Sequence, residues 1–121
     1  MYARRSFRII PMLAAGSAML ALAWPAHALD ADAAQAVLKK NECGKCHALD
    51  KDKKGPSLKK IAAKYKGKSD GEEKAIKNMT TGIKVKLDDG TEEEHKVIKL
   101  DPKKADEMAQ IKNVAEYILS R

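Results

Sequence analysis

Aromatic residues are scarce in this chain of 121 residues, which has one Trp, one Phe and three Tyr. Only Tyr65 and Tyr117 lie beyond residue 28. Because aromatic side chains contribute the largest buried areas to a protein core, a domain with so few of them needs another source of apolar contact. A bound apolar cofactor would provide it.

Acidic residues are absent from the first 28 residues, which are built unlike the rest. A head with three arginines precedes an uncharged stretch, residues 9–24, and the tripeptide Ala26-His27-Ala28 follows. A basic head, an apolar core and a small-x-small cut site are typical of a secretory signal peptide. We therefore predict that residues 1–28 are a cleaved signal peptide and that residues 29–121 form the folded domain.

An uncleaved membrane anchor is the alternative interpretation of the N-terminus. Residues 9–29 have no ionisable side chain other than His27 and approach the length of about 20 residues that spans a bilayer. Either interpretation places the domain outside the cytoplasm, and cleavage predicts a periplasmic protein without stable membrane insertion. Removing 28 of the 121 residues leaves 93, and the net charge falls from +7 to +4 because three arginines leave. This length allows one small domain.

Capping residues and apolar spacing predict a mostly helical domain. We expect helices over 33–41 after the cap Asp32, from the cap Ser57 to near Tyr65, from the capping-box sequence Ser69–Glu72 toward Met79, and from Pro102 to Ser120 after the cap Asp101. Between the last two helices, Ile83, Val85 and Leu87 alternate with lysines before Asp88-Asp89-Gly90. This alternation predicts a short β-hairpin near residues 83–98.

The candidate site is the pentapeptide Cys43-Gly44-Lys45-Cys46-His47. C-x-x-C-H is the attachment signature of c-type haem, because each thiol can add to one vinyl group and the adjacent imidazole can bind the iron. A redox dithiol also has the C-x-x-C spacing, but its fold requires strands that alternate with helices. Structural zinc requires four N or S ligands, and residues 29–121 have two Cys and two His at unsuitable spacing. We therefore expect Cys43 and Cys46 to hold one covalent haem c, with His47 as the proximal iron ligand.

On these residues the domain resembles the class I cytochromes c. The matching motifs are, in order, Cys43-Gly44-Lys45-Cys46-His47, Gly55-Pro56 and Tyr117-Ile118-Leu119. The resemblance implies the small all-α class I fold with a haem core, to which the short hairpin would be added. It implies that the carbonyl of Pro56 accepts the second ring N–H of His47, as a partner that orients the ligand. It also implies that the first and last helices cross, with Ala36 or Val37 meeting Tyr117.

The departure from the family is a missing methionine. Class I proteins usually supply a Met ligand just before the last helix, and Thr91–Pro102 contains none. Met108 falls on the apolar stripe of the last helix and is expected in the core, whereas Met79 fits either the core or the iron. His95 lies where the family's ligand usually sits, although its charged neighbours are typical of an exposed residue. We expect His95 to be the distal ligand with Met79 as the runner-up, and two imidazoles predict a lower potential than His/Met ligation.

These residues predict an exported carrier that passes single electrons between redox partner proteins through Fe(II)/Fe(III), with no catalytic residue. Residues 39–68 hold eleven lysines against three acidic residues, a patch that would steer the carrier to an acidic docking face. Basic and aromatic residues are not interleaved, so nucleic acid is not an expected partner. Two alternatives stay open. The first is a five-coordinate haem protein that binds a small gas or peroxide, and the second is a cytochrome subunit of a larger dehydrogenase.

Overall fold

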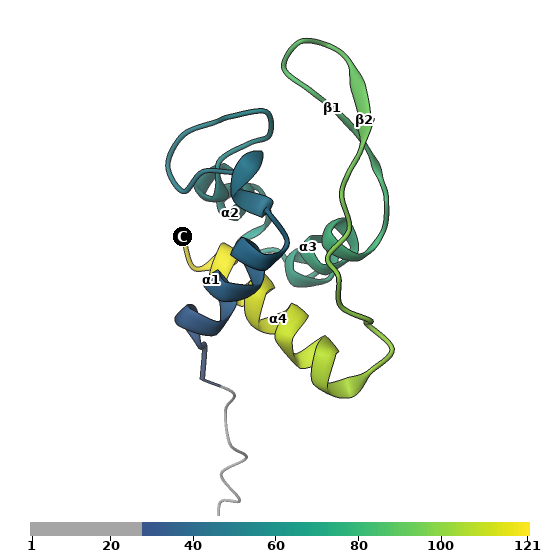
Figure 1. Cartoon of the computed structure of the whole chain (residues 1–121). Helices are drawn as coiled ribbons and strands as arrows, with labels where there is room; N and C mark the ends of the chain where they lie inside the picture. The colour runs from purple at the N-terminus through teal and green to yellow at the C-terminus, as the bar shows by residue number, and fades with distance from the viewer. Residues whose placement is uncertain (1–27) are drawn as a thin grey trace, which may run out of the picture.

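The computed structural model describes residues 28–121, so the predicted signal peptide lies, apart from Ala28, outside the described residues. The elements in chain order (Figure 1) are α1 (Ala31–Lys40), the 3-10 turn η1 (Cys43–Lys45), α2 (Leu58–Tyr65), α3 (Gly71–Thr80), β1 (Lys84–Lys86), β2 (Glu92–Glu94) and α4 (Ala105–Leu119). The mostly helical fold and the small hairpin predicted from the sequence are both confirmed.

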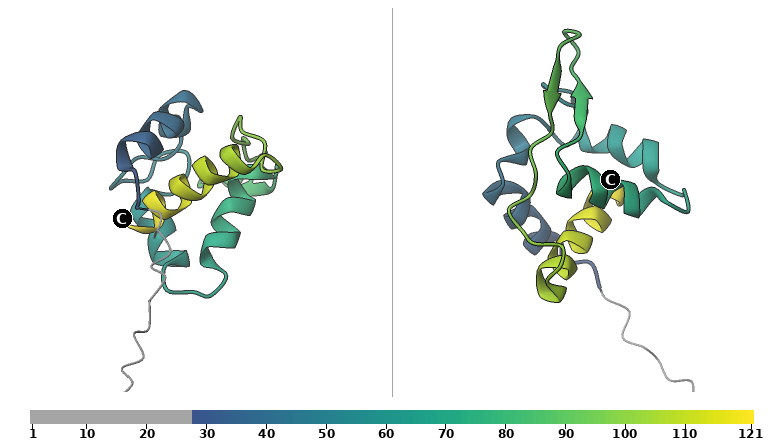
Figure 2. Two further views of the ribbon diagram at one scale, coloured as in Figure 1. Left: turned by 90° about the horizontal axis from the view of Figure 1, so that it is seen from below. Right: turned by 90° about the vertical axis from the view of Figure 1, so that its right-hand side faces the viewer.

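Helix α4 is the element against which α1, α2 and α3 all pack (Figure 2). Its predicted apolar stripe is largely buried: Ile111 and Val114 are fully enclosed, and Ile118 is 6% exposed. The core cluster consists of Ala34, Leu58, Val114, Tyr117 and Ile118, with Ala31, Val37, Leu38, Ile61 and Met79 packed against it. Val37 and Tyr117 thus belong to one contact region, as expected for crossed first and last helices.

The N-caps of the first two helices agree only in part with the sequence. Helix α1 starts earlier than predicted because its cap is Asp30 and not Asp32. The Asp30 carboxylate accepts the N–H of Ala33 at 2.9 Å. Helix α2 has the predicted cap, in which the Ser57 hydroxyl accepts the N–H of Lys60 at 3.2 Å.

The last two helices also begin differently from the prediction. The N-cap of α3 is Asp70 instead of Ser69, and its side chain makes no capping hydrogen bond. Helix α4 begins at Ala105, three residues later than predicted, because Asp101 begins a separate turn in which its carbonyl accepts the N–H of Lys104 at 3.1 Å. There its carboxylate accepts the N–H of Lys103 at 2.9 Å.

The hairpin leaves the helical body and returns to it (Figure 2). Strands β1 and β2 are antiparallel, and the register pairs Lys84 with Glu94 and Lys86 with Glu92. Opposite charges therefore face each other across the strands, which favours this pairing. The returning chain is held to α3, since the N–H of Ile98 donates to the carbonyl of Met79 at 2.8 Å.

A pair of hydrogen bonds joins the start of α1 to the middle of α4. The side-chain oxygen of Asn113 accepts the N–H of Asp30 at 2.9 Å, and its amide nitrogen donates to the Asp30 carbonyl at 2.7 Å. Asn113 is only 6% exposed. These bonds satisfy a buried amide and fix Asp30 where it can cap α1.

Replacing Asn113 by Ala should lower the free energy of unfolding by about 1–3 kcal/mol, because the part-buried N–H of Asp30 loses its partner. The Asp30 carbonyl keeps the N–H of Ala34 as a donor. Denaturant unfolding of the holoprotein, followed by circular dichroism, measures the change. Gln110→Ala removes an exposed amide from the same helix and serves as the control. Equal midpoints for the two variants would contradict the prediction.

Candidate functional site

The attachment motif follows α1 after one sharp turn of the chain. Glu42 adopts a left-handed backbone conformation with φ of 57°, which ends the helix and directs the chain into η1. The N–H groups of Cys46 and His47 both donate to the carbonyl of Cys43, at 3.2 and 3.0 Å. This compact turn presents two half-buried free thiols beside one imidazole.

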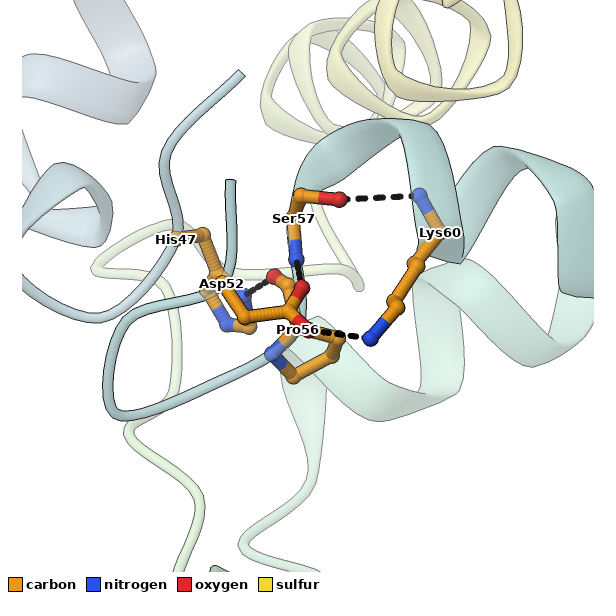
Figure 3. Close-up of polar contacts among 5 residues, drawn as sticks. All are labelled: His47, Asp52, Pro56, Ser57 and Lys60. Carbon is orange, nitrogen blue, oxygen red and sulfur yellow. Dashed lines mark hydrogen bonds and ion pairs between the residues drawn. The ribbon is translucent and has the colours of Figure 1, made fainter. Parts of the chain in front are cut away.

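The ring of His47 is held by the chain around Gly55-Pro56 (Figure 3). Its Nδ1 lies 2.6 Å from the carbonyl oxygen of Pro56. Because a carbonyl only accepts, Nδ1 carries the proton and Nε2 keeps its lone pair. A Cβ on Gly55 would lie 2.7 Å from Cε1 of His47, so only glycine allows this close approach.

Asp52 stabilises the same loop through its side chain. It was not identified from the sequence alone. Its carboxylate accepts the N–H of Ser57 at 2.8 Å and pairs with Lys60 (Figure 3). The Lys60 ammonium, followed by the Ser57 N–H, holds the pKa of Asp52 below its usual range. Asp residues favour turns through such side-chain to backbone bonds, and its place in the loop before Gly55-Pro56 was the signal available.

His95 follows β2 and points its ring toward His47. The ring centres of the two imidazoles are 6.0 Å apart, with an angle of 38° between their planes. The backbone N–H of His95 donates to the carbonyl of Ile83 at 2.7 Å, so the base of the hairpin positions the residue. His95 is not the exposed surface group that its charged neighbours suggested.

The imidazole of His95 has an unsatisfied buried atom. Its Nδ1 has no hydrogen-bond partner. Burial, and then the neighbouring charge of His47, lower the pKa of His95. A neutral imidazole is the form that binds metals, and a buried polar atom without a partner calls for a functional explanation.

Met79 and Met108 were the other residues considered as iron ligands. Met79 is half-buried and packs against the core cluster. Met108 is also half-buried and lies near the start of α4. The two histidines are therefore brought together, whereas Met79 lies with the core cluster.

A cavity of about 510 Å³ adjoins the attachment motif. Its walls include Leu38, Leu49, Leu58 and Tyr117 as well as Cys43 and His47. Burial raises the pKa of the Cys43 thiol, which is opposite to the activated thiolate of redox dithiols. Across residues 28–121 no three His, Cys, Asp or Glu side chains are grouped to hold a metal ion by themselves. An apolar cavity, two free thiols and an oriented imidazole fit a covalently attached porphyrin, and they define a c-type haem protein.

Comparisons with known proteins agree with this class. The family model for cytochrome c matches residues 31–121. Cytochrome c-551 of Stutzerimonas stutzeri is 39% identical over 78 residues, which cover 62% of this chain and 70% of that protein. The crystal structure of class 1 cytochrome MtoD from Sideroxydans lithotrophicus ES-1 matches with a TM-score of 0.69 and 49% identity, over 77% of this chain and 97% of that one.

The chain belongs to the cytochrome c family and is a class I c-type cytochrome. Its cofactor is a covalently attached haem c with iron, and its function is electron transfer, which involves redox partner proteins. The fold and cofactor expected from the sequence are thereby confirmed.

Replacing Gly55 by Ala should displace the His47 ring, because the added carbon overlaps Cε1. Overpacking of this kind costs about 1–3 kcal/mol, and we expect a less stable holoprotein with a shifted haem absorption spectrum. Gly44→Ala is the matched control, since its added carbon has no protein atom within 4 Å. An unchanged spectrum and unfolding midpoint for Gly55→Ala would show that the ring does not depend on this clearance.

Proposed function

We propose that this cytochrome is a six-coordinate monohaem carrier in which Cys43 and Cys46 attach the haem and His47 and His95 are the axial ligands. The observation that carries the proposal is the 6.0 Å separation of the two imidazole rings. The buried Nδ1 of His95, which has no hydrogen-bond partner, supports it further. Placement of His95 beside His47 favours this arrangement over the five-coordinate alternative with an open iron position.

The haem supplies one-electron Fe(II)/Fe(III) chemistry when it is bound. The contribution of the chain is orientation. Pro56 holds the proton on Nδ1 of His47, so that Nε2 is the nitrogen available to the metal. His95 in place of Met lowers the expected potential, because methionine ligation raises it. We propose no catalytic residue, because both histidines would serve as iron ligands.

We propose that partners with an acidic face dock on the lysine-rich segment, residues 39–68. All eleven of its lysines are exposed, and four are in ion pairs with Glu42, Asp50, Asp52 and Glu93. The segment also contains Cys43 and His47, so positive charge surrounds the attachment site. Such a field steers a negatively charged partner toward the haem.

We propose further that residues 1–28 are removed on export and that the mature domain works in the periplasm. The sequence of a basic head, an apolar core and Ala26-His27-Ala28 supports this. Within the described part of the chain, no helix is both long enough and apolar enough to cross a membrane.

Ligation by His95 is tested by the spectrum of the ferric holoprotein. The wild type should be low-spin and lack the weak long-wavelength band that a methionine sulfur produces, and redox titration should give a potential below the His/Met range. His95→Ala should become high-spin, whereas Met79→Leu should keep the wild-type spectrum. A methionine band that disappears in Met79→Leu would assign the ligand to Met79 instead.

Electron transfer to an acidic redox protein should slow steeply as ionic strength rises, because salt screens attraction between exposed charges. Stopped-flow measurement of the bimolecular rate constant over a salt series tests this. Reversing the charge of Lys66 and Lys68, which are exposed, should flatten the salt dependence. A flat response in the wild type would show that the lysines only promote solubility.

A further inference from the structure

Asn41 connects two segments that are far apart in the sequence. It is the C-cap of α1 and precedes Cys43 by two residues. Its amide nitrogen donates to the carbonyl of Val37 at 2.9 Å, and its side-chain oxygen accepts the N–H of Lys99 at 2.7 Å. One half-buried side chain therefore bonds both the helix before the attachment motif and the chain just after His95.

The segment from His95 to Lys99 is here termed the distal segment. Two of its backbone N–H groups bond to α3 and to the chain just before β1. The N–H of His95 donates to Ile83, and that of Ile98 donates to Met79. Ile98 is 7% exposed and anchors the segment by burial. The third bond, from the Lys99 N–H to the Asn41 side chain, is instead directed toward α1 and the haem-attachment motif.

An ion pair between Lys54 and Glu93 also bridges the attachment loop and the hairpin, at 2.6 Å. Its side chains are 48% and 50% exposed. Exposed pairs contribute little and are weakened further by salt. The bond from the Lys99 N–H to the Asn41 oxygen is exposed to water as well, but Asn41 is half-buried and its side chain is held at a second point by the Val37 carbonyl.

We propose that Asn41 is a positioning residue that holds the distal segment against the attachment side and so keeps His95 on the iron. This inference rests on the proposed ligation by His95. Without the Asn41 oxygen, the N–H of Lys99 loses its partner and the distal segment opens more often, as weakly held segments do by local unfolding. Each opening would move His95 away from the iron and let an external ligand bind there.

Cyanide binding to the ferric holoprotein measures this opening. We expect Asn41→Ala to bind cyanide faster than the wild type, by about two- to tenfold, the range expected for losing one hydrogen bond. Asn41→Asp keeps an acceptor oxygen for Lys99 but loses the donor to Val37, and it should bind at nearly the wild-type rate. Hydrogen exchange at the Lys99 amide should accelerate in Asn41→Ala and not in Asn41→Asp.

Two further variants, Asn113→Ala and His95→Ala, distinguish an error in the role of Asn41 from an error in the ligation by His95. Asn113→Ala removes another long-range amide contact, at the far end of α1, and should leave the cyanide rate unchanged although it destabilises the fold. Equal acceleration in Asn113→Ala, or none in Asn41→Ala, overturns the role of Asn41 while ligation by His95 stands. A wild type that binds cyanide as fast as His95→Ala overturns the ligation, and this inference with it.

Discussion

The separation of 6.0 Å between the imidazole rings of His47 and His95 is the constraint on which the rest of the structure depends. The two residues come from different parts of the chain, one just after η1 and the other just after β2. Crossing of α1 over α4 fixes the first, and the path from α3 through the hairpin fixes the second. The scarcity of aromatic side chains is consistent with this plan, because the haem supplies apolar surface that the core of small aliphatic residues lacks.

The two sides of the site are held with unequal rigidity. On the His47 side, the Pro56 carbonyl, the clearance at Gly55 and the brace by Asp52 restrict the ring from several directions. On the His95 side, single backbone bonds and buried Ile98 hold a segment that follows an exposed hairpin. Local opening takes place where few contacts must be lost. The distal segment is therefore the part of the site that can open without disturbing the core.

Local signals in the sequence predicted the elements but not all of their ends. Ser57 was correctly identified as a cap, since its hydroxyl accepts the N–H of Lys60 in the first turn of α2. Asp32 was wrong because Asn113, which is 83 positions from Asp30, binds the backbone there and makes Asp30 the cap. Asp101 was wrong for a local reason, since its carboxylate accepts the N–H of Lys103 in a turn before α4. The cap of α1 thus depends on a contact that the nearby sequence does not contain.

The sequence by itself determined the cofactor and the contact of His47 with Pro56, because C-x-x-C-H and Gly55-Pro56 are short motifs whose chemistry depends on neighbouring residues. It also determined the stripe of α4 through helical periodicity. Only the tertiary structure decided that His95 faces His47 while Met79 packs with the core. It alone showed Asn41 bonded to Lys99 across 58 positions. Such pairs form only when the chain is folded, since which of several candidates meets the site depends on where the hairpin returns against α3.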